Sequence, residues 1–263
     1  MSERFEFGAN WQSFARLVDA ERLQSAQDEL ARLLGRRDLS GLSFLDIGCG
    51  SGLHALAAHR LGAGRIVAID YDPASVATAR ELLARFGAHG AAVERGDALA
   101  LDERLGEFDI VYSWGVLHHT GDMAGAVRKA AQRTRPGGLL ALALYGRTPC
   151  CGAWKRIKRW YVRATPRKKA AAEALYVRLV GLSLALRGQR LAEHIAGYRS
   201  ARGMDFAHDV RDWIGGYPYE SITPEALHAL LAPMGFELVS RKVLRRTGLL
   251  GSGNDEYLYR RWA

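Results

Sequence analysis

A glycine-rich turn between a short apolar run and a helix constrains the fold of this chain most. The turn consists of Asp46, Ile47, Gly48, Cys49, Gly50, Ser51 and Gly52. The preceding run, Ser43–Ile47, is typical of a buried parallel strand, and the small residues of Ser51–Leu61 predict a helix. Glycine permits positive φ angles and close approach of a ligand to the backbone, and a helix N-terminus offers free N–H groups. The sequence therefore predicts a ligand-binding strand–turn–helix unit.

Strands and helices alternate on both sides of this unit. Further strands are predicted at Arg65–Tyr71, Ala91–Arg95, Phe108–Trp114, Leu139–Tyr145, Phe236–Arg245 and Asp255–Trp262. Helices are predicted between them, at 73–86, 101–105, 121–133 and 223–234. Such alternation indicates a parallel sheet with helices on both faces. We therefore expect an α/β fold with a doubly wound, mainly parallel, seven-stranded sheet of the Rossmann-like type.

Two segments fall outside the alternation. Residues 11–34 predict one helix, and residues 149–219 are mostly helical with no strand signal. Insertions at this edge of a sheet commonly form lids. We therefore expect four parts: an N-terminal helical cap (1–40), a Rossmann-like core (41–147), a basic helical lid or substrate insertion (148–221) and a C-terminal helix with two strands that complete the sheet (222–263).

Three carboxylates follow or end successive strands near the turn. Asp46 precedes the first glycine by two residues, Asp70 ends the second strand and Asp97 follows the third. A carboxylate at the end of the second strand can accept both ribose hydroxyls of a nucleotide, and one at Asp97 can accept from an adenine amino group. The glycine spacing is GxGxG and not the GxGxxG of NAD-binding proteins.

These residues resemble those of a known family. Phe44–Ala98 is similar to the S-adenosylmethionine (SAM)-binding half of class I methyltransferases, and Phe108–Thr120 to the fourth motif of the ubiquinone-type O-methyltransferases. The resemblance implies that SAM is the cofactor, that S-adenosylhomocysteine (SAH) is a product and that no metal is needed. It implies that the cofactor contacts Trp11, Asp46, Gly48, Cys49, Gly50, Gly52, Asp70, Tyr71, Asp97, Ala98, Ser113 and Trp114.

The flanking segments show a narrower resemblance. Phe5–Trp11, Arg202–Glu220 and Gly253–Arg261 are similar to a bacterial family of uncharacterised small-molecule methyltransferases. That resemblance says little about the substrate. Phe7, Asn10 and Trp11 either fold over the cofactor or pack on the sheet. Cys49 lies inside the glycine turn, and we interpret it as a small packing residue.

Two adjacent histidines follow the fourth strand, at the end expected to face the methyl group. Methyl transfer is an in-line displacement that needs alignment and exclusion of water. A phenol, alcohol or ammonium acceptor also needs a base, and histidine suits that role. His118 and His119 are the candidates, and the resemblance favours His119. Alternatively, the second histidine caps the next helix or packs against Trp114. The Asp/Asn-Pro-Pro-Tyr motif of amino-group methyltransferases is absent from the sequence.

A second group of polar and aromatic residues lies late in the insertion. It consists of Arg202, Met204, Asp205, His208, Asp209, Asp212, Trp213, Tyr217, Tyr219 and Glu220. We expect Arg202, His208, Tyr217 and Tyr219 to contact the substrate, with packing against the sheet edge as the alternative. His208 and Asp212 are four residues apart and so share a helix face. That spacing suits a metal site or a surface hydrogen bond, and we expect no metal.

The positive charge of the chain is concentrated in one window. Its 37 basic and 28 acidic residues give a net charge of +9, yet residues 123–172 hold thirteen Lys or Arg and no acid. Within this window, Trp154, Ile157, Trp160, Tyr161 and Ala164 are predicted to form an apolar helix face. The charges of Lys155, Arg156, Lys158, Arg159 and Arg163 are predicted to surround it. Residues 154–169 thus suit an anionic membrane, nucleic acid or an acidic carrier or substrate, or they form a lid helix whose charges are simply solvated.

Cellular location and function follow as expectations. Cys49, Cys150 and Cys151 imply no disulfide framework and a reducing cytoplasm. The longest apolar runs are too short to span a bilayer, so association with a membrane would be peripheral. We expect a SAM-dependent O-methyltransferase for a small or lipid-like metabolite. The alternatives are a tRNA-modifying methyltransferase that uses residues 155–169, and a non-catalytic SAM-binding protein. The oligomeric state stays open.

Overall fold

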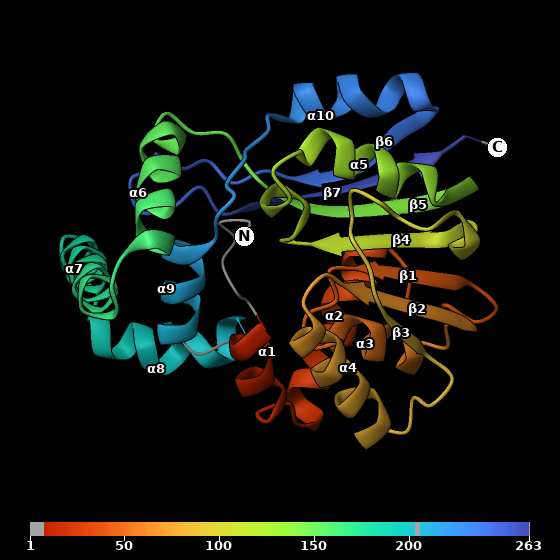
Figure 1. Cartoon of the computed structure of the whole chain (residues 1–263), viewed down its shortest axis with the longest axis horizontal. Helices are drawn as coiled ribbons and strands as arrows, with labels where there is room; N and C mark the ends of the chain where they lie inside the picture. Colours follow the sequence, from red (N-terminus) through yellow and green to blue (C-terminus); the bar gives the residue numbers. More distant parts are fainter. Residues whose placement is uncertain (1–7, 203–205, 263) are drawn as a thin grey trace. The chain divides into compact units, whose positions relative to one another are not determined.

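The computed structural model describes residues 8–202 and 206–262, which form two compact units (Figure 1). The core unit contains residues 8–147, 220–245 and 253–262. The insertion unit contains residues 148–202, 206–219 and the turn 246–252. The four-part division expected from the sequence stays a prediction.

The core unit is built on one seven-stranded sheet with the order β3-β2-β1-β4-β5-β7-β6. The strands are β1 (Ser43–Ile47), β2 (Arg65–Asp70), β3 (Ala92–Arg95), β4 (Phe108–Trp114), β5 (Thr134–Tyr145), β6 (Phe236–Lys242) and β7 (Asn254–Arg261). β1 to β5 pair in parallel, and β7 pairs antiparallel with both β5 and β6. The predicted doubly wound, mainly parallel sheet is confirmed.

The strand order reverses between β1 and β4. From β1 the chain proceeds outward to β2 and β3, and it then returns to place β4 on the other side of β1. In open α/β sheets, ligands bind outside the carboxyl ends of the strands at such a reversal. The glycine turn follows β1 and the two histidines follow β4, so both lie where this rule expects a site.

Helices cover both faces of the sheet. They are α1 (Gly8–Ala15), α2 (Ala20–Leu34), α3 (Leu53–Arg60), α4 (Pro73–Arg85), α5 (Met123–Gln132) and α10 (Pro224–Leu231), with 3₁₀ turns at Glu103–Leu105, Leu117–His119 and Ala232–Met234. α5 and α10 pack in the same apolar core as Val111. The next residue of that strand, Tyr112, contacts His54 of α3. Because neighbouring strand residues point to opposite faces, α3 lies on the face opposite α5.

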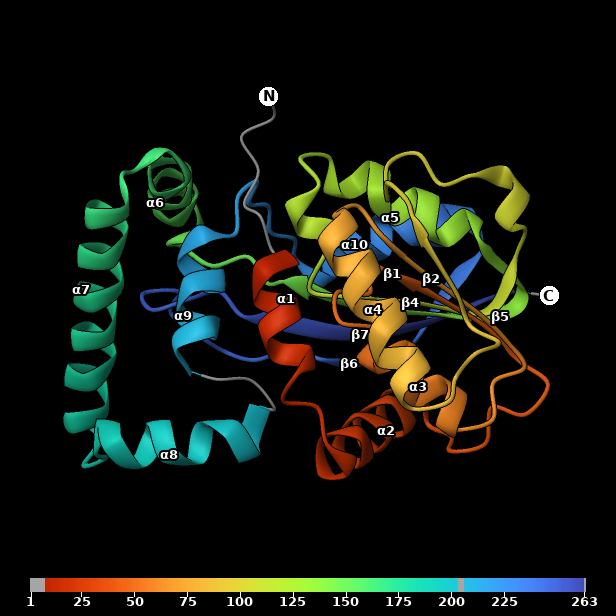
Figure 2. The ribbon, with the colours of Figure 1, turned by 60° about the horizontal axis from the view of Figure 1, so that its bottom comes forward.

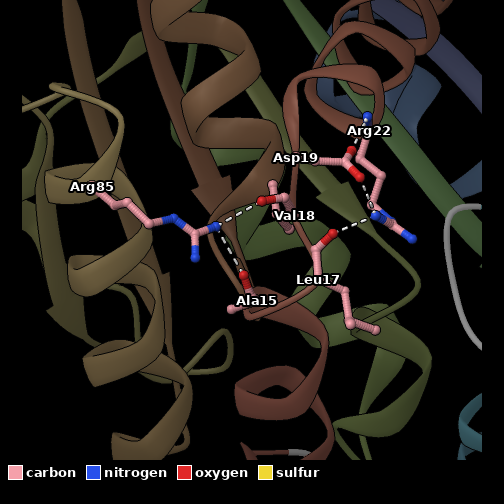
Figure 3. Close-up of polar contacts among 6 residues, drawn as sticks. All are labelled: Ala15, Leu17, Val18, Asp19, Arg22 and Arg85. Atoms are coloured by element: carbon pink, nitrogen blue, oxygen red, sulfur yellow. Dashed lines mark hydrogen bonds and ion pairs between the residues drawn. The ribbon is translucent and has the colours of Figure 1, made fainter.

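The N-terminal segment corrects one prediction. Instead of one helix there are two, because Asp19 caps α2 by accepting a hydrogen bond from the Arg22 backbone N–H at 2.9 Å. Aspartate is a favourable N-cap residue, but a prediction made from the spacing of apolar residues does not take capping into account. Arg85 Nη2 of α4 holds the break between the helices by donating to the carbonyls of Ala15 and Val18, at 3.0 and 2.9 Å (Figure 3).

The start of β5 was also predicted wrongly. Residues 136–138, a Pro-Gly-Gly sequence expected to be a turn, lie inside the strand, which begins at Thr134. Thr134 pairs with Phe108, and the register shifts before Ile110 pairs with Leu139. This register shift accommodates the proline and the two glycines within the strand.

The insertion unit is helical, as predicted. Its helices are α6 (Cys151–Arg163), α7 (Pro166–Ala185), α8 (Leu191–Arg202) and α9 (Phe206–Gly215) (Figure 2). They enclose an apolar core made of Tyr161, Tyr198, Phe206, Val210 and Ile214. No helix in the described part of the chain is long and apolar enough to cross a membrane.

Helix α6 buries a different face from the predicted one. Trp154, Lys158 and Tyr161 are buried, whereas Ile157 and Trp160 are exposed. Lys158 Nζ donates to the Trp213 carbonyl and lies 3.9 Å from the centre of the Trp213 ring. A lysine can be buried when its apolar stem packs and its ammonium group meets an aromatic face. Burial holds the pKa of Lys158 well below its usual range, although the charge of Asp212 acts in the opposite direction.

Candidate cofactor and active site

The glycine turn is held against β2 by backbone hydrogen bonds. The N–H groups of Gly48 and Cys49 both donate to the Ile69 carbonyl, at 2.8 and 3.0 Å. Gly50 has a φ of 54°, and a Cβ there would lie 2.7 Å from Cε2 of Trp11. The turn therefore requires glycine at this position for its backbone conformation and for the approach of the indole ring.

Asp70 connects the end of β2 to the turn. Its carboxylate accepts from the backbone N–H of Gly50 and from that of Asp72, both at 2.9 Å. Asp72 in turn caps α4 and accepts from the Gly8 backbone N–H at 2.9 Å. These bonds bring together the turn, the end of β2 and the start of α1. Each Asp70 oxygen accepts one of them and retains capacity for a ligand hydroxyl.

Asp46 is a buried carboxyl beside the turn. It is 2% exposed, and its Oδ2 atom has no hydrogen-bond partner among the described residues. Burial, reinforced by repulsion from Asp70, raises the pKa of Asp46 to about 8, against a lowering contribution from the Ala55 backbone N–H. A buried acceptor without a partner is costly, so this site favours a ligand that brings a cation or a hydrogen-bond donor.

Asp97 and Tyr71 lie at the neighbouring strand ends. Asp97 accepts from the Leu99 backbone N–H at 2.9 Å, which orders the segment after β3, and the next residue, Ala98, is buried. Tyr71 is exposed, and the Arg95 guanidinium lies 5.7 Å from the centre of its ring. Tyr71 and Asp97 thus follow β2 and β3, two strands that pair in parallel.

The remaining predicted cofactor contacts differ in their surroundings. Trp11 of α1 lies over Gly50. Ser113 is fully buried and donates to the Ile47 carbonyl at 2.8 Å, so its hydroxyl ties β4 to β1. Trp114 is half-buried and stacks on Tyr112 with ring centres 5.9 Å apart. Contact of these residues with a cofactor stays a prediction.

Val116 and His54 are site residues that sequence reasoning missed. Val116 occupies the space that a Cβ on Gly48 would need, so it supports the turn. His54 of α3 stacks near Trp114, and burial lowers the pKa of its imidazole to about 4. The small residues of α3 gave no signal that this histidine lies against the sheet.

The two histidines after β4 have different surroundings. His118 is fully buried, its Nδ1 accepts from the Tyr145 backbone N–H at 3.2 Å, and its ring stacks on that of Tyr145 at 3.7 Å. Its carbonyl accepts from the Glu220 backbone N–H at 3.0 Å. His119 is half-buried and meets the Tyr145 ring edge-on at 5.3 Å. His118 is thus packed in the core, whereas His119 is partly open to solvent, and a catalytic role for either stays a prediction.

Tyr145 and Glu220 complete this group. Tyr145 ends β5 and touches both histidines. Glu220 Oε2 accepts from the Met123 backbone N–H at 2.8 Å, at the start of α5. The sequence gave no reason to place Tyr145 at the site, because its contacts depend on the pairing of β4 with β5.

The predicted substrate residues lie in the insertion unit. Tyr219 is buried, with its hydroxyl 2.9 Å from Ser252 Oγ and 3.2 Å from Cys151 Sγ, both in the insertion unit, and its contact with a substrate stays a prediction. Tyr217 is half-buried. The side chains of Arg202 and His208 lie outside the described part, as do Phe7, Met204 and Asp205 entirely. Among the described residues, no group of three or more His, Cys, Asp or Glu could hold a metal ion.

Comparison with known proteins agrees with this geometry. The family described as "Methyltransferase domain" matches residues 44–138. Ubiquinone biosynthesis O-methyltransferase from Methylocella silvestris is 40% identical over 112 residues, which are 43% of this chain and 43% of that protein. The enzyme of the same name from Xanthomonas oryzae is 36% identical over 141 residues, 50% of this chain and 55% of that protein. The matches thus span about half the length of these curated relatives.

Solved structures share the fold at low identity. Magnesium protoporphyrin IX methyltransferase from Synechocystis, with bound SAH, superposes with a TM-score of 0.55 at 16% identity, covering 92% of this chain and 84% of that one. An S-adenosylmethionine-dependent methyltransferase from Mesorhizobium loti gives 0.55 at 19% identity, covering 91% and 100%.

The fold, the turn and these matches define the class of protein. The chain carries a class I, Rossmann-like, SAM-dependent methyltransferase domain, as its motifs predicted.

Proposed function

We propose that the protein transfers the methyl group of SAM to an oxygen atom of a small or lipid-like metabolite. The observation that carries the proposal is the pair of carboxyls beside the glycine turn. Asp46 is buried without a partner for Oδ2, and Asp70 lies near enough to raise its pKa. A cofactor with an ammonium group, a sulfonium group and ribose hydroxyls supplies the cation and the donors that this pair lacks.

Four side chains in or around the turn would hold the cofactor. The remaining acceptor capacity of Asp70 suits the ribose hydroxyls, and the free Oδ2 of Asp46 suits the amino-acid end. Asp97 retains an oxygen for the adenine amino group. Trp11, which lies over Gly50, limits access of water to the turn. When bound, SAM supplies an activated methyl group.

His119 is the proposed base. It follows β4 at the sheet reversal and is half-buried, whereas His118 is engaged with the Tyr145 backbone. His119 would take the proton of an acceptor hydroxyl as the oxygen gains the methyl group, and Tyr145 would orient the imidazole from its edge.

Oxygen is favoured over other acceptor atoms by the relatives. Those quoted above are named ubiquinone biosynthesis O-methyltransferases. Neither the relatives nor the described fold supports the tRNA-modifying alternative, and the three intact acids argue against a non-catalytic protein.

The test is methyl transfer from radiolabelled SAM to a panel of phenols, alcohols, carboxylates and amines. We expect labelling of hydroxyl acceptors, with loss of activity in His119→Ala and retention in His89→Ala, a control variant at an exposed histidine. Labelling of carboxylates alone, unaffected by His119→Ala, would show that no base is needed. Labelling of amines alone would contradict O-methylation.

A further inference from the structure

The outer side of α6 combines exposed apolar and basic side chains. Ile157 is 41% exposed and Trp160 is 47% exposed. From residue 155 to the end of α6, every other exposed position is cationic: Lys155, Arg156, Arg159 and Arg163. We call these six residues the α6 patch. The patch lies opposite the buried side of the helix, where Trp154, Lys158 and Tyr161 face the insertion core.

The charge of this region has one sign. Neither α6 nor any other position between residues 123 and 172 carries an acid. The next helix opens with Arg167, Lys168 and Lys169 directly after Pro166. Because Lys158 is turned inward, the cations that remain on the surface of α6 are those of the α6 patch. Such a surface attracts anions over a distance set by ionic strength.

Helix α7 exposes a further apolar stripe. Three leucines of α7 and its C-cap residue Leu186 are between 46% and 82% exposed and fall at i, i+4, i+7 and i+11: Leu175, Leu179, Leu182 and Leu186. This spacing places them on one side of the helix. Scattered exposed leucines are ordinary, but a contiguous apolar stripe marks an interaction surface. The insertion unit thus presents aliphatic groups as well as cations.

Three kinds of partner can be distinguished by this chemistry. A second copy of the chain would bring the same cations against one another. A nucleic acid would satisfy the cations and could stack on Trp160, but it offers nothing to Ile157 or to the leucines. An anionic bilayer satisfies both groups, because phosphate headgroups pair with Lys and Arg while acyl chains accept aliphatic side chains.

We infer that the α6 patch binds the surface of an anionic lipid bilayer. Helix α6 lies along the membrane interface, with Ile157 among the upper acyl chains and the indole of Trp160 at the level of the headgroups. This inference concerns the insertion unit and stands apart from the methyl transfer proposed above. A lipid-like acceptor would be concentrated at the same surface.

The test is binding of the full chain to vesicles. We compare sedimentation with vesicles of phosphatidylcholine alone and with vesicles that contain phosphatidylglycerol, at low and high salt. Lys155→Gln/Arg156→Gln should lower the partition coefficient about 30-fold on anionic vesicles, since each cation contributes about 1 kcal/mol, roughly fivefold. Ile157→Gln/Trp160→Gln should lower it at least about tenfold, since it removes two apolar side chains from the interface.

A matched control distinguishes binding through the α6 patch from nonspecific binding of exposed apolar residues to vesicles. Val243→Gln/Leu244→Gln changes two residues of the core unit that are 41% and 51% exposed, close to the values of the patch. This variant should bind like the wild type. A second readout is the blue shift of tryptophan fluorescence on binding, which should shrink in Trp160→Phe. Unchanged SAH affinity and circular dichroism show that each variant is folded.

The outcomes decide the inference. The inference is supported if binding to anionic vesicles needs both the cationic and the apolar residues of the α6 patch. No binding of the folded wild type to anionic vesicles overturns it, as does binding that the control variant weakens equally. Binding to RNA of mixed sequence with no binding to vesicles would assign the surface to nucleic acid instead. SAH binding is measured separately, so failure here leaves the proposed methyl transfer standing.

Discussion

Asp46→Asn removes a buried charge without changing the shape of the side chain, and it should alter how stability depends on pH. In the cofactor-free protein, burial and the charge of Asp70 raise the pKa of Asp46 from 3.8 to about 8. The folded state therefore binds one more proton than the unfolded state between these two pH values. Stability falls as pH rises through this window, and the loss is complete above pH 8.

The magnitude follows from the two pKa values. A rise from 3.8 to about 8 corresponds to roughly 6 kcal/mol between the protonated and ionised forms, at about 1.4 kcal/mol per pH unit. Of this total, about 2 kcal/mol is lost between pH 6.5 and the folded pKa of about 8, at about 1.4 kcal/mol per pH unit. His54 acts in the opposite sense, because burial lowers its pKa to about 4. It adds stability as pH rises to about 6.5, where its unfolded form loses its proton.

The assay is urea denaturation of cofactor-free wild type and Asp46→Asn at several pH values from 6.5 to 8.5, above the influence of His54. The stability of the wild type should fall relative to that of the variant across this range. Asp38→Asn is the control, because Asp38 is exposed and its pKa is lowered by hydrogen bonds from Ser40; its pH profile should parallel that of the wild type. Parallel profiles for wild type and Asp46→Asn would refute the account of a buried, partnerless carboxyl.

Four further changes test other parts of the structure. Asp70→Ala should weaken SAH binding by about 1–3 kcal/mol in calorimetry, as for the loss of a hydrogen bond to a charged group; unchanged affinity would exclude Asp70 as the ribose ligand. His119→Ala should lower turnover by roughly 100-fold with SAH affinity retained, and equal turnover would reject it as the base. His118→Ala should instead lower the free energy of unfolding by about 2 kcal/mol or more, because it leaves a cavity in the core and removes the side chain that accepts from the Tyr145 N–H. A loss of turnover with an unchanged free energy of unfolding would contradict a packing role. Lys158→Met should flatten the rise in stability as pH increases toward about 10.4, the pKa of an unfolded lysine, since burial lowers the pKa of Lys158 and the folded protein loses this proton before the unfolded chain does; an unchanged pH slope would show that the ammonium is well compensated.

Strands and site residues could be predicted from the sequence where the local residue pattern and the topology of the sheet agree. β1 and β4 were predicted at their observed bounds, Ser43–Ile47 and Phe108–Trp114, because each is a continuous buried run. The glycine turn was recognisable because its spacing, the strand before it and the helix after it all specify the same structure. Asp46 and Asp70 could be placed beside it, since the carboxyl ends of parallel strands share one edge of a sheet.

The predictions failed where contacts between distant residues decided the outcome. The inward orientation of Lys158 depends on Trp213 and Tyr219, whose rings lie 3.9 and 5.1 Å from its ammonium. A helical periodicity that counts lysine as a surface residue cannot register those rings. Likewise, the different surroundings of His118 and His119 depend on Tyr145, which the pairing of β4 with β5 brings to them. Adjacent residues of the same type carry no local signal of which one is buried.

Calorimetric titration of the cofactor-free protein with SAH shows whether the glycine turn and its carboxyls form a cofactor site. We expect binding at micromolar affinity or tighter, weakened in Asp70→Ala and unchanged in the control Asp38→Asn. The absence of binding to folded, cofactor-free protein would contradict this expectation, because the glycine turn, Asp46 and Asp70 would then hold some other ligand or none.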